Sequence, residues 1–209
     1  MKILLIVVVL IVAFGAGAII WIGMPKGPSL EEVAHLRAPA LVEMGPQKVL
    51  QVEAKGNPND VGKAAFGLLM KTYYKLEGVP KGGADFQPPR ARWPVGVEED
   101  MNEWIGLYAM PVPEAVATLP EGASSDGLTV ELVTWEYGYV AQILHVGPWD
   151  QEPETVEGLM DFIEAEGYEV SGLHEEEYLK GPGLFFAGNP DEYLTLIRYP
   201  VSKIVGEDG

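Results

Sequence analysis

The sequence predicts an α+β protein in which two related units form an antiparallel sheet with two main helices on one face. Three observations predict this class. Segments rich in strand-forming residues outnumber the helical patterns, only two long amphipathic patterns occur, and the second half of the chain repeats the order of the first. Two helices are too few to cover both faces of a parallel sheet, so the helices are expected on one side of an antiparallel sheet.

The repeat spans residues 41–112 and 132–201. Gly67-Leu68-Leu69 in the first unit matches Gly158-Leu159-Met160 in the second, and apolar runs before and after these triplets match in the same order. Matches that keep one order indicate a duplicated unit. Two such units are expected to pair about a pseudo-two-fold axis. The seam between them is a natural position for a ligand cleft.

Each unit is predicted to contain two strands, a helix and two further strands. In the first unit Val49 to Ala54 is a strand, and Asn59 with Asp60 begins a helix that runs to about Leu76 because both residue types favour helix N-termini. Its apolar stripe is predicted to face the sheet. The remaining strands are predicted at Pro89 to Trp93 and at Trp104 to Met110.

The second unit begins with a predicted hairpin. Residues 128–135 and 139–146 are rich in β-branched and aromatic residues, and Glu136-Tyr137-Gly138 separates them as a turn. A helix from Pro153 to Glu166 follows, because proline suits a first helical turn and the apolar residues recur at helical spacing. The last two strands are predicted at 172–179 and 193–199.

The strand at 172–179 carries three successive glutamates. Alternation along a strand puts His174, Glu176 and Tyr178 on one face, and Glu175 and Glu177 on the other with Leu173 and Leu179. Superposing the repeats places Pro89 to Trp93 opposite this strand, which gives the seam a basic, aromatic side and an acidic side. We expect Glu176 and Tyr178 to line a pocket, and Glu175 and Glu177 to remain solvated edge charges.

These motifs resemble those of the GyrI-like small-molecule-binding domain, which is also the effector-binding domain of multidrug-responsive bacterial transcription activators. The resemblance covers residues 41–201 and rests on the run ending His145-Val146-Gly147-Pro148-Trp149, the glutamate strand, and the run ending Arg198-Tyr199-Pro200-Val201. It implies an eight-stranded sheet built from two βαββ-type units. It also implies that a glutamate, here Glu176 beside Tyr178, contacts cationic amphipathic drugs between aromatic rings. Some relatives instead hydrolyse electrophilic cyclopropane compounds.

Aromatic side chains near such a carboxylate add cation–π attraction of about 0.5 to 2 kcal/mol each. The candidate ligand-binding residues are therefore Glu176, Tyr178, His174, Trp149, Trp93, Tyr108 and Trp104. Further candidates for a pocket wall are Tyr137, Tyr139 and Tyr168, and His145 is a weaker candidate. For every aromatic residue in this set, ordinary core packing is the alternative interpretation.

Composition excludes several classes of function. The chain has 14 Lys and Arg against 31 Asp and Glu, a net charge of −17, which disfavours nucleic acid and favours cationic partners. It has no cysteine, so thiolate catalysis and cysteine-ligated metals are excluded. No Gly-x-Ser-x-Gly motif is present, and the three histidines are scattered, so neither a serine hydrolase nor a metal or cofactor is expected.

The first residues predict a membrane segment. Residues 3–22 contain no charge and are long enough to span a bilayer as a helix, with Lys2 before them. The alternative is a cleaved signal peptide with a cut near Ala16-Gly17-Ala18. The expected organisation is an anchor or signal at 1–23, a linker at 24–40, the ligand-binding domain at 41–201 and a tail at 202–209. The soluble domain is expected outside the cytoplasm.

Three functions fit these patterns. The first is a membrane-tethered binding module for amphipathic, cationic small molecules. The second is a small-molecule hydrolase for cyclopropane-type electrophiles, with Glu176 as general base and Tyr178 as the group that holds or protonates the developing anion. The third is an interaction domain without a ligand. No helix-turn-helix precedes the domain in this sequence, so activator function is not implied.

Overall fold

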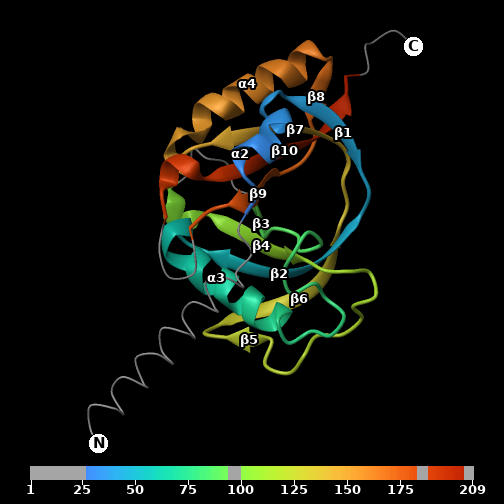
Figure 1. Ribbon diagram of the computed structural model, residues 1–209, viewed down its shortest axis with the longest axis vertical. Coiled ribbons are helices and arrows are strands. Elements are labelled where there is room, and N and C mark those ends of the chain that lie inside the picture. The colour runs from blue at the N-terminus through green and yellow to red at the C-terminus, as the bar shows by residue number, and fades with distance from the viewer. Residues whose placement is uncertain (1–26, 94–99, 183–187, 205–209) are drawn as a thin grey trace, which may run out of the picture. The chain divides into compact units, whose positions relative to one another are not determined.

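The computed structural model describes residues 27–93, 100–182 and 188–204 (Figure 1). The chain divides into two units, and the larger one, residues 27–79 and 87–209, contains all the strands and helices given below. The predicted membrane segment at 3–22 lies outside the described residues. Within the described ranges, no helix is long and apolar enough to cross a membrane.

The larger unit is built on a ten-stranded sheet in which every pairing is antiparallel. Its strand order is β1 (Ala40–Met44), β7 (Gly138–Val146), β10 (Leu194–Lys203), β9 (His174–Lys180), β3 (Arg90–Trp93), β4 (Ile105–Pro111), β2 (Gln47–Lys55), β6 (Leu128–Trp135) and β5 (Ser124–Ser125). The tenth strand, β8 (Tyr168–Val170), pairs with β10. The α+β class is confirmed. The strand number exceeds the expected eight because the short strands β5 and β8 were not predicted.

The predicted hairpin between residues 128–135 and 139–146 is wrong. Although only Glu136 and Tyr137 separate β6 from β7, β6 pairs with β2, and β7 pairs with β1 and β10. A turn signal specifies that the chain changes direction, but not which strand becomes the partner. Pairing with β2 lets Trp135 pack against Val49 and Ala109 in a buried cluster. The first strand of each predicted unit thus pairs with the other unit.

Two long helices begin near the predicted positions. α3 (Pro58–Tyr73) starts after Asn57, whose side chain accepts a hydrogen bond from the backbone N–H of Asn59. α4 (Glu152–Ala165) carries Pro153 in its first turn and follows the short 3₁₀ helix η3 (Trp149–Gln151). Shorter helical turns are α2 (Leu30–Val33), η1 (Ala34–Arg37), η2 (Met101–Glu103) and η4 (Pro190–Glu192).

Both long helices cover the same face of the sheet. One row of residues crosses the four strands β10, β9, β3 and β4, and their side chains share a face because each lies directly opposite the next. In that order the residues are Ile197, Glu176, Ala91 and Tyr108. Ile197 belongs to the core cluster formed with Leu159 and Ile163 of α4. At the other end of the row, the Tyr108 ring packs edge-on against Phe66 of α3. Glu176 therefore lies on the face that both helices cover, between Ile197 and Tyr108 in this row.

The junction between the two halves of the sheet is the pairing of β3 with β9. Arg90 lies opposite Glu177, Arg92 opposite Glu175 and Trp93 opposite His174. The expected juxtaposition of Pro89 to Trp93 with the acidic strand is therefore present.

The expectation that Glu175 and Glu177 are solvated edge charges is wrong. Their exposed fractions are 1% and 6%. Strand β9 is central in the sheet, and its neighbours β3 and β10 both carry arginines on the face away from the helices. The glutamates are buried because these arginines neutralise them.

Glu175 is the centre of this buried charge network. It forms ion pairs with Arg92 at 2.8 Å, Arg198 at 3.2 Å and Arg90 at 3.9 Å. Tyr137 donates its hydroxyl to Glu175 at 3.1 Å and accepts a hydrogen bond from Arg90 at 2.8 Å. Tyr137 therefore lies on the face opposite Glu176, so its prediction as a wall of the Glu176 pocket is wrong.

Replacing Glu175 with glutamine should lower the free energy of unfolding by about 3 kcal/mol, because breaking a buried ion pair leaves uncompensated arginine charges. Urea denaturation of the full chain, followed by tryptophan fluorescence, measures this change. The matched control is Glu43→Gln, which removes the same charge from an exposed position in β1 and should change stability by less than about 0.5 kcal/mol. Equal effects of the two substitutions would contradict the assigned network.

Candidate functional site

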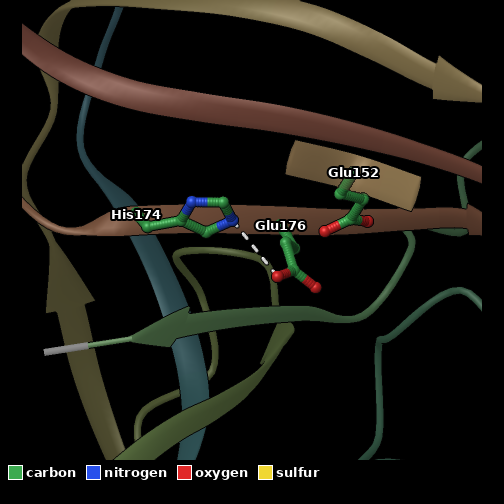
Figure 2. A group of neighbouring side chains, drawn as sticks. All are labelled: Glu152, His174 and Glu176. Carbon is green, nitrogen blue, oxygen red and sulfur yellow. Dashed lines mark hydrogen bonds and ion pairs between the residues drawn. The ribbon is translucent and has the colours of Figure 1, made fainter. Parts of the chain in front are cut away.

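The candidate site is centred on the carboxylate of Glu176. Trp93 donates its indole N–H to Glu176 Oε1 at 2.8 Å, and Tyr178 donates its hydroxyl to Oε2 at 2.6 Å. His174 Nε2 lies 3.1 Å from Oε1 (Figure 2). The three partners come from two adjacent strands, β3 and β9, because alternation brings His174, Glu176 and Tyr178 to one face.

Glu176 differs from its two neighbours in the kind of partner it has. Among the described residues, its one ion-pair partner is His174, whereas Glu175 and Glu177 pair with arginines. Its side chain is 12% exposed. Burial alone would raise its pKa, but the hydrogen bonds and electrostatic attraction from His174, Tyr178 and Trp93 outweigh burial and lower the pKa. Glu176 is therefore ionised at neutral pH.

Glu152 is a second carboxyl group at this site, which the sequence did not reveal. It lies at the start of α4, is 8% exposed, and its carboxyl group comes close to that of Glu176 (Figure 2). Its Oε1 is buried and has no hydrogen-bond partner among the described residues. Burial, and then the negative charge of Glu176, raise the pKa of Glu152 to about 9. Glu152 is thus a neutral acid beside an ionised one at pH 7.

No signal in the sequence distinguishes Glu152 from other acids near a helix start. Glu154, two residues later, also lies in the first turn of α4 but is exposed. Which acid points toward the sheet depends on how η3 leads into α4. That is a feature of the tertiary structure.

Aromatic rings surround the carboxylate on the helix face. Tyr178 packs edge-on against Phe66 and Trp149, with ring centroids 5.7 Å apart in both pairs. Trp93 contacts Trp104 and Tyr108, also with centroids 5.7 Å apart. The structure thus brings the predicted residues Trp93, Trp104, Tyr108, Trp149, His174 and Tyr178 into one connected group with Glu176. Phe66 of α3 was not among the residues predicted from the sequence.

Two phenols next to this group respond to its negative charge. Burial, and then Glu176, raise the pKa of Tyr108 to about 12, and its buried hydroxyl has no hydrogen-bond partner among the described residues. Tyr199 lies 2.6 Å from His174 Nδ1, and burial followed by the nearby carboxylates raises its pKa to about 12 as well. Both phenols are therefore neutral and can donate or accept hydrogen bonds at the site.

Three further candidates from the sequence have other contacts. Tyr139 and Tyr168 pack against each other, with ring centroids 6.5 Å apart. The ring nitrogens of His145 lie 2.9 Å from Thr155 Oγ1 and 3.1 Å from the carbonyl oxygen of Pro148. Buried in this way, His145 links β7 to the start of α4 and has a structural role. The expected ligand cleft at the seam stays a prediction.

Neither a family model nor a curated protein matches the sequence. Solved structures do match. An uncharacterized conserved protein from Listeria innocua is 24% identical, with a TM-score of 0.66 over 85% of this chain and 94% of that one. A hydrolase from Listeria innocua is 22% identical, with a TM-score of 0.64 over 85% of this chain and 100% of that one.

The C-terminal domain of EcmrR also matches, at 16% identity and a TM-score of 0.55, over 80% of this chain and 98% of that domain. At such identities the likeness shows the fold alone. The chain shares the fold of these solved structures, and its α+β sheet agrees with the fold that the sequence resemblance implied.

Proposed function

We propose that this chain binds amphipathic, cationic organic molecules through Glu176 and the surrounding aromatic rings. The observation that carries the proposal is the set of partners around Glu176. Three adjacent glutamates lie on β9, and the two that face away from the helices are neutralised by arginines. Glu176 has no arginine partner in the described ranges, and its partners are an indole, a phenol and His174. Its negative charge therefore remains available to a cationic ligand.

The physical environment strengthens this attraction. Coulomb attraction is larger in a partly buried site than in water, and Glu176 is 12% exposed. A cation that reaches the carboxylate would also contact ring faces, which contribute about 0.5 to 2 kcal/mol each. The net charge of −17 attracts cations to the protein at longer range.

The side chains of Trp149 and Phe66 would have to move for a ligand to reach Glu176. Both pack edge-on against Tyr178, the phenol that holds Glu176. Trp149 is 39% exposed and lies on η3, before the first turn of α4. A rotation of these rings would replace their edge-on contacts with contacts to the ligand. The proposal therefore includes side-chain movement on binding.

Replacing Glu176 with glutamine should weaken binding of the cationic dye rhodamine 6G by about tenfold or more, because the substitution removes the charge and keeps the shape. Fluorescence anisotropy of the dye, titrated with the full chain in the presence of a metal chelator, measures the affinity. Glu43→Gln is the matched control, since Glu43 is exposed, and should bind as tightly as the unmodified protein.

An anionic dye of the same ring system, fluorescein, should bind at least about tenfold more weakly than rhodamine 6G. Equal affinity of the unmodified protein and Glu176→Gln for rhodamine 6G would refute the role of Glu176. No binding of any dye would favour the alternative of an interaction domain without a ligand.

A hydrolase is the second candidate, and the pair of carboxyl groups is the observation that favours it. Glu176 is ionised and could accept a proton from water while the water oxygen attacks a ring carbon of a cyclopropane-type electrophile. The carbon–carbon bond that breaks leaves its electron pair on the conjugated carbonyl oxygen. Glu152, a neutral acid beside Glu176, could give that oxygen a proton. From the sequence, Tyr178 was the group expected to fill this second role.

Hydrolysis of a spirocyclopropane dienone by the full chain, followed by its absorbance, tests this candidate. Turnover above that of buffer is expected, and Glu176→Gln and Glu152→Gln should each lower it by about a hundredfold. Glu154→Gln removes an exposed acid from the same helical turn and should leave the rate unchanged. The hydrolase reading fails if no turnover occurs, or if the rates of Glu176→Gln and the unmodified protein agree.

The proposal also includes membrane tethering by residues 3–22, with the ligand-binding domain outside the cytoplasm. Its support is the uncharged apolar run in the sequence. After expression in a bacterium, the full chain should sediment with membranes and remain there after a carbonate wash. A variant with Leu10→Lys and Val12→Lys should become soluble, since each central lysine costs about 3 kcal/mol on insertion. A full chain that is released by carbonate, or that loses its first residues to a signal peptidase, would contradict tethering.

A further inference from the structure

One group of metal-ligating side chains stands out within the described part of the chain. Donor atoms of Glu152, His174 and Glu176 all lie within 4.8 Å of one another. Figure 2 shows the three side chains converging, Glu152 from the start of α4 and the other two from β9. We propose that these residues form a binding site for a divalent transition-metal ion such as Zn²⁺ or Mn²⁺. The site goes beyond the proposed binding of organic molecules, although both ligands would use Glu176.

A second observation points independently to a ligand at this place. Glu152 is more than nine-tenths buried, and its Oε1 has no hydrogen-bond partner among the described residues. A buried oxygen without a partner costs about 1 to 3 kcal/mol. The hydroxyl of Tyr108, on the same face as Glu176, is also buried without a partner in the described ranges. A bound cation, with any water it carries, would supply partners for such oxygens.

The neighbours of these ligands already hold them in position. His174 Nδ1 lies 2.6 Å from the hydroxyl of Tyr199, which leaves Nε2 to face Glu176. Trp93 and Tyr178 hold the two oxygens of Glu176. Metal-ligating histidines typically bond through their second nitrogen to a neighbouring group, and ligating carboxylates are hydrogen-bonded in the same way. The arrangement around His174 and Glu176 follows that pattern.

The donor set selects the class of metal. A bound metal ion would displace the proton of Glu152, because carboxyl groups bind metals in their ionised form. One imidazole nitrogen with two carboxylate oxygens suits Zn²⁺, Mn²⁺ or Fe²⁺, whereas Mg²⁺ and Ca²⁺ prefer oxygen ligands alone. Metal–ligand bonds of about 2.1 Å place neighbouring donors about 3 to 3.5 Å apart. His174 Nε2 and Glu176 Oε1 are already 3.1 Å apart. Glu152 would complete the site by a small rotation of its side chain toward Glu176.

Isothermal titration calorimetry tests the site. The full chain, first stripped with a chelator and then kept in excess Mg²⁺ to occupy surface carboxylates, is titrated with Zn²⁺ in the absence of any dye. One Zn²⁺ should bind per chain. Glu152→Gln and His174→Gln should each weaken its affinity by at least about tenfold, because each removes one ligand. Neither substitution alters the buried arginine network on the other face.

Matched controls distinguish Zn²⁺ binding at this site from Zn²⁺ binding to exposed side chains. Glu154→Gln removes an exposed acid from the same turn of α4, and His35→Gln removes an exposed histidine from η1. Both should bind Zn²⁺ as the unmodified protein does. Absence of a stoichiometric site in excess Mg²⁺, or equal affinity in Glu152→Gln and Glu154→Gln, would overturn the proposal.

Co²⁺ provides a spectroscopic check on the nitrogen ligand. Its visible absorption, when bound to the unmodified protein, should change in His174→Gln and stay the same in His35→Gln. An unchanged spectrum in His174→Gln would exclude His174 as a ligand. Because dye binding is measured with a chelator and metal binding without a dye, either function can fail in these experiments while the other holds.

Discussion

The structure depends on the pairing of β3 with β9, which joins the two halves of the sheet. This junction places four charged side chains, two arginines and two glutamates, on one face, where Arg198 from β10 joins them. Buried charges of this kind are tolerated only when they are paired. Because the arginines neutralise Glu175 and Glu177 on one side, the glutamate between them can carry its charge on the other side without an arginine partner in the described ranges. The charge network therefore supports the candidate site.

The two faces of β9 show how one strand can serve two purposes. A period of two residues sends alternate glutamates to opposite faces. On the face without helices they hold the sheet together through ion pairs with Arg90, Arg92 and Arg198. On the helix face Glu176 contacts His174, the neutral donors of Trp93 and Tyr178, and the acid Glu152. The proposed binding of organic cations, activation of water and binding of a divalent ion would all use the charge of Glu176.

The exchange of strands between the halves explains why the site is a property of the whole larger unit. Strand β1 pairs with β7, and β6 pairs with β2, so neither half of the sheet is complete without a strand from the other. The site itself also draws on both halves, with Trp93 and Tyr108 from one and Glu152, His174 and Glu176 from the other. Separation of the repeats would leave sheet edges without their partner strands and would take the Trp93 donor away from Glu176.

The sequence by itself determined the α+β class, both long helices and the central strands, because these depend on local periodicity and capping. The period of two also placed Glu176 on the face opposite Glu175 and Glu177. It also placed Pro89 to Trp93 opposite the glutamate strand through the internal repeat. Only the tertiary structure decided that β6 and β7 do not form a hairpin, since strand pairing is set by packing between distant segments such as Trp135 and Val49. Likewise, only the fold brings Glu152 to Glu176 and Arg198 to Glu175, because these contacts join residues that no sequence period relates.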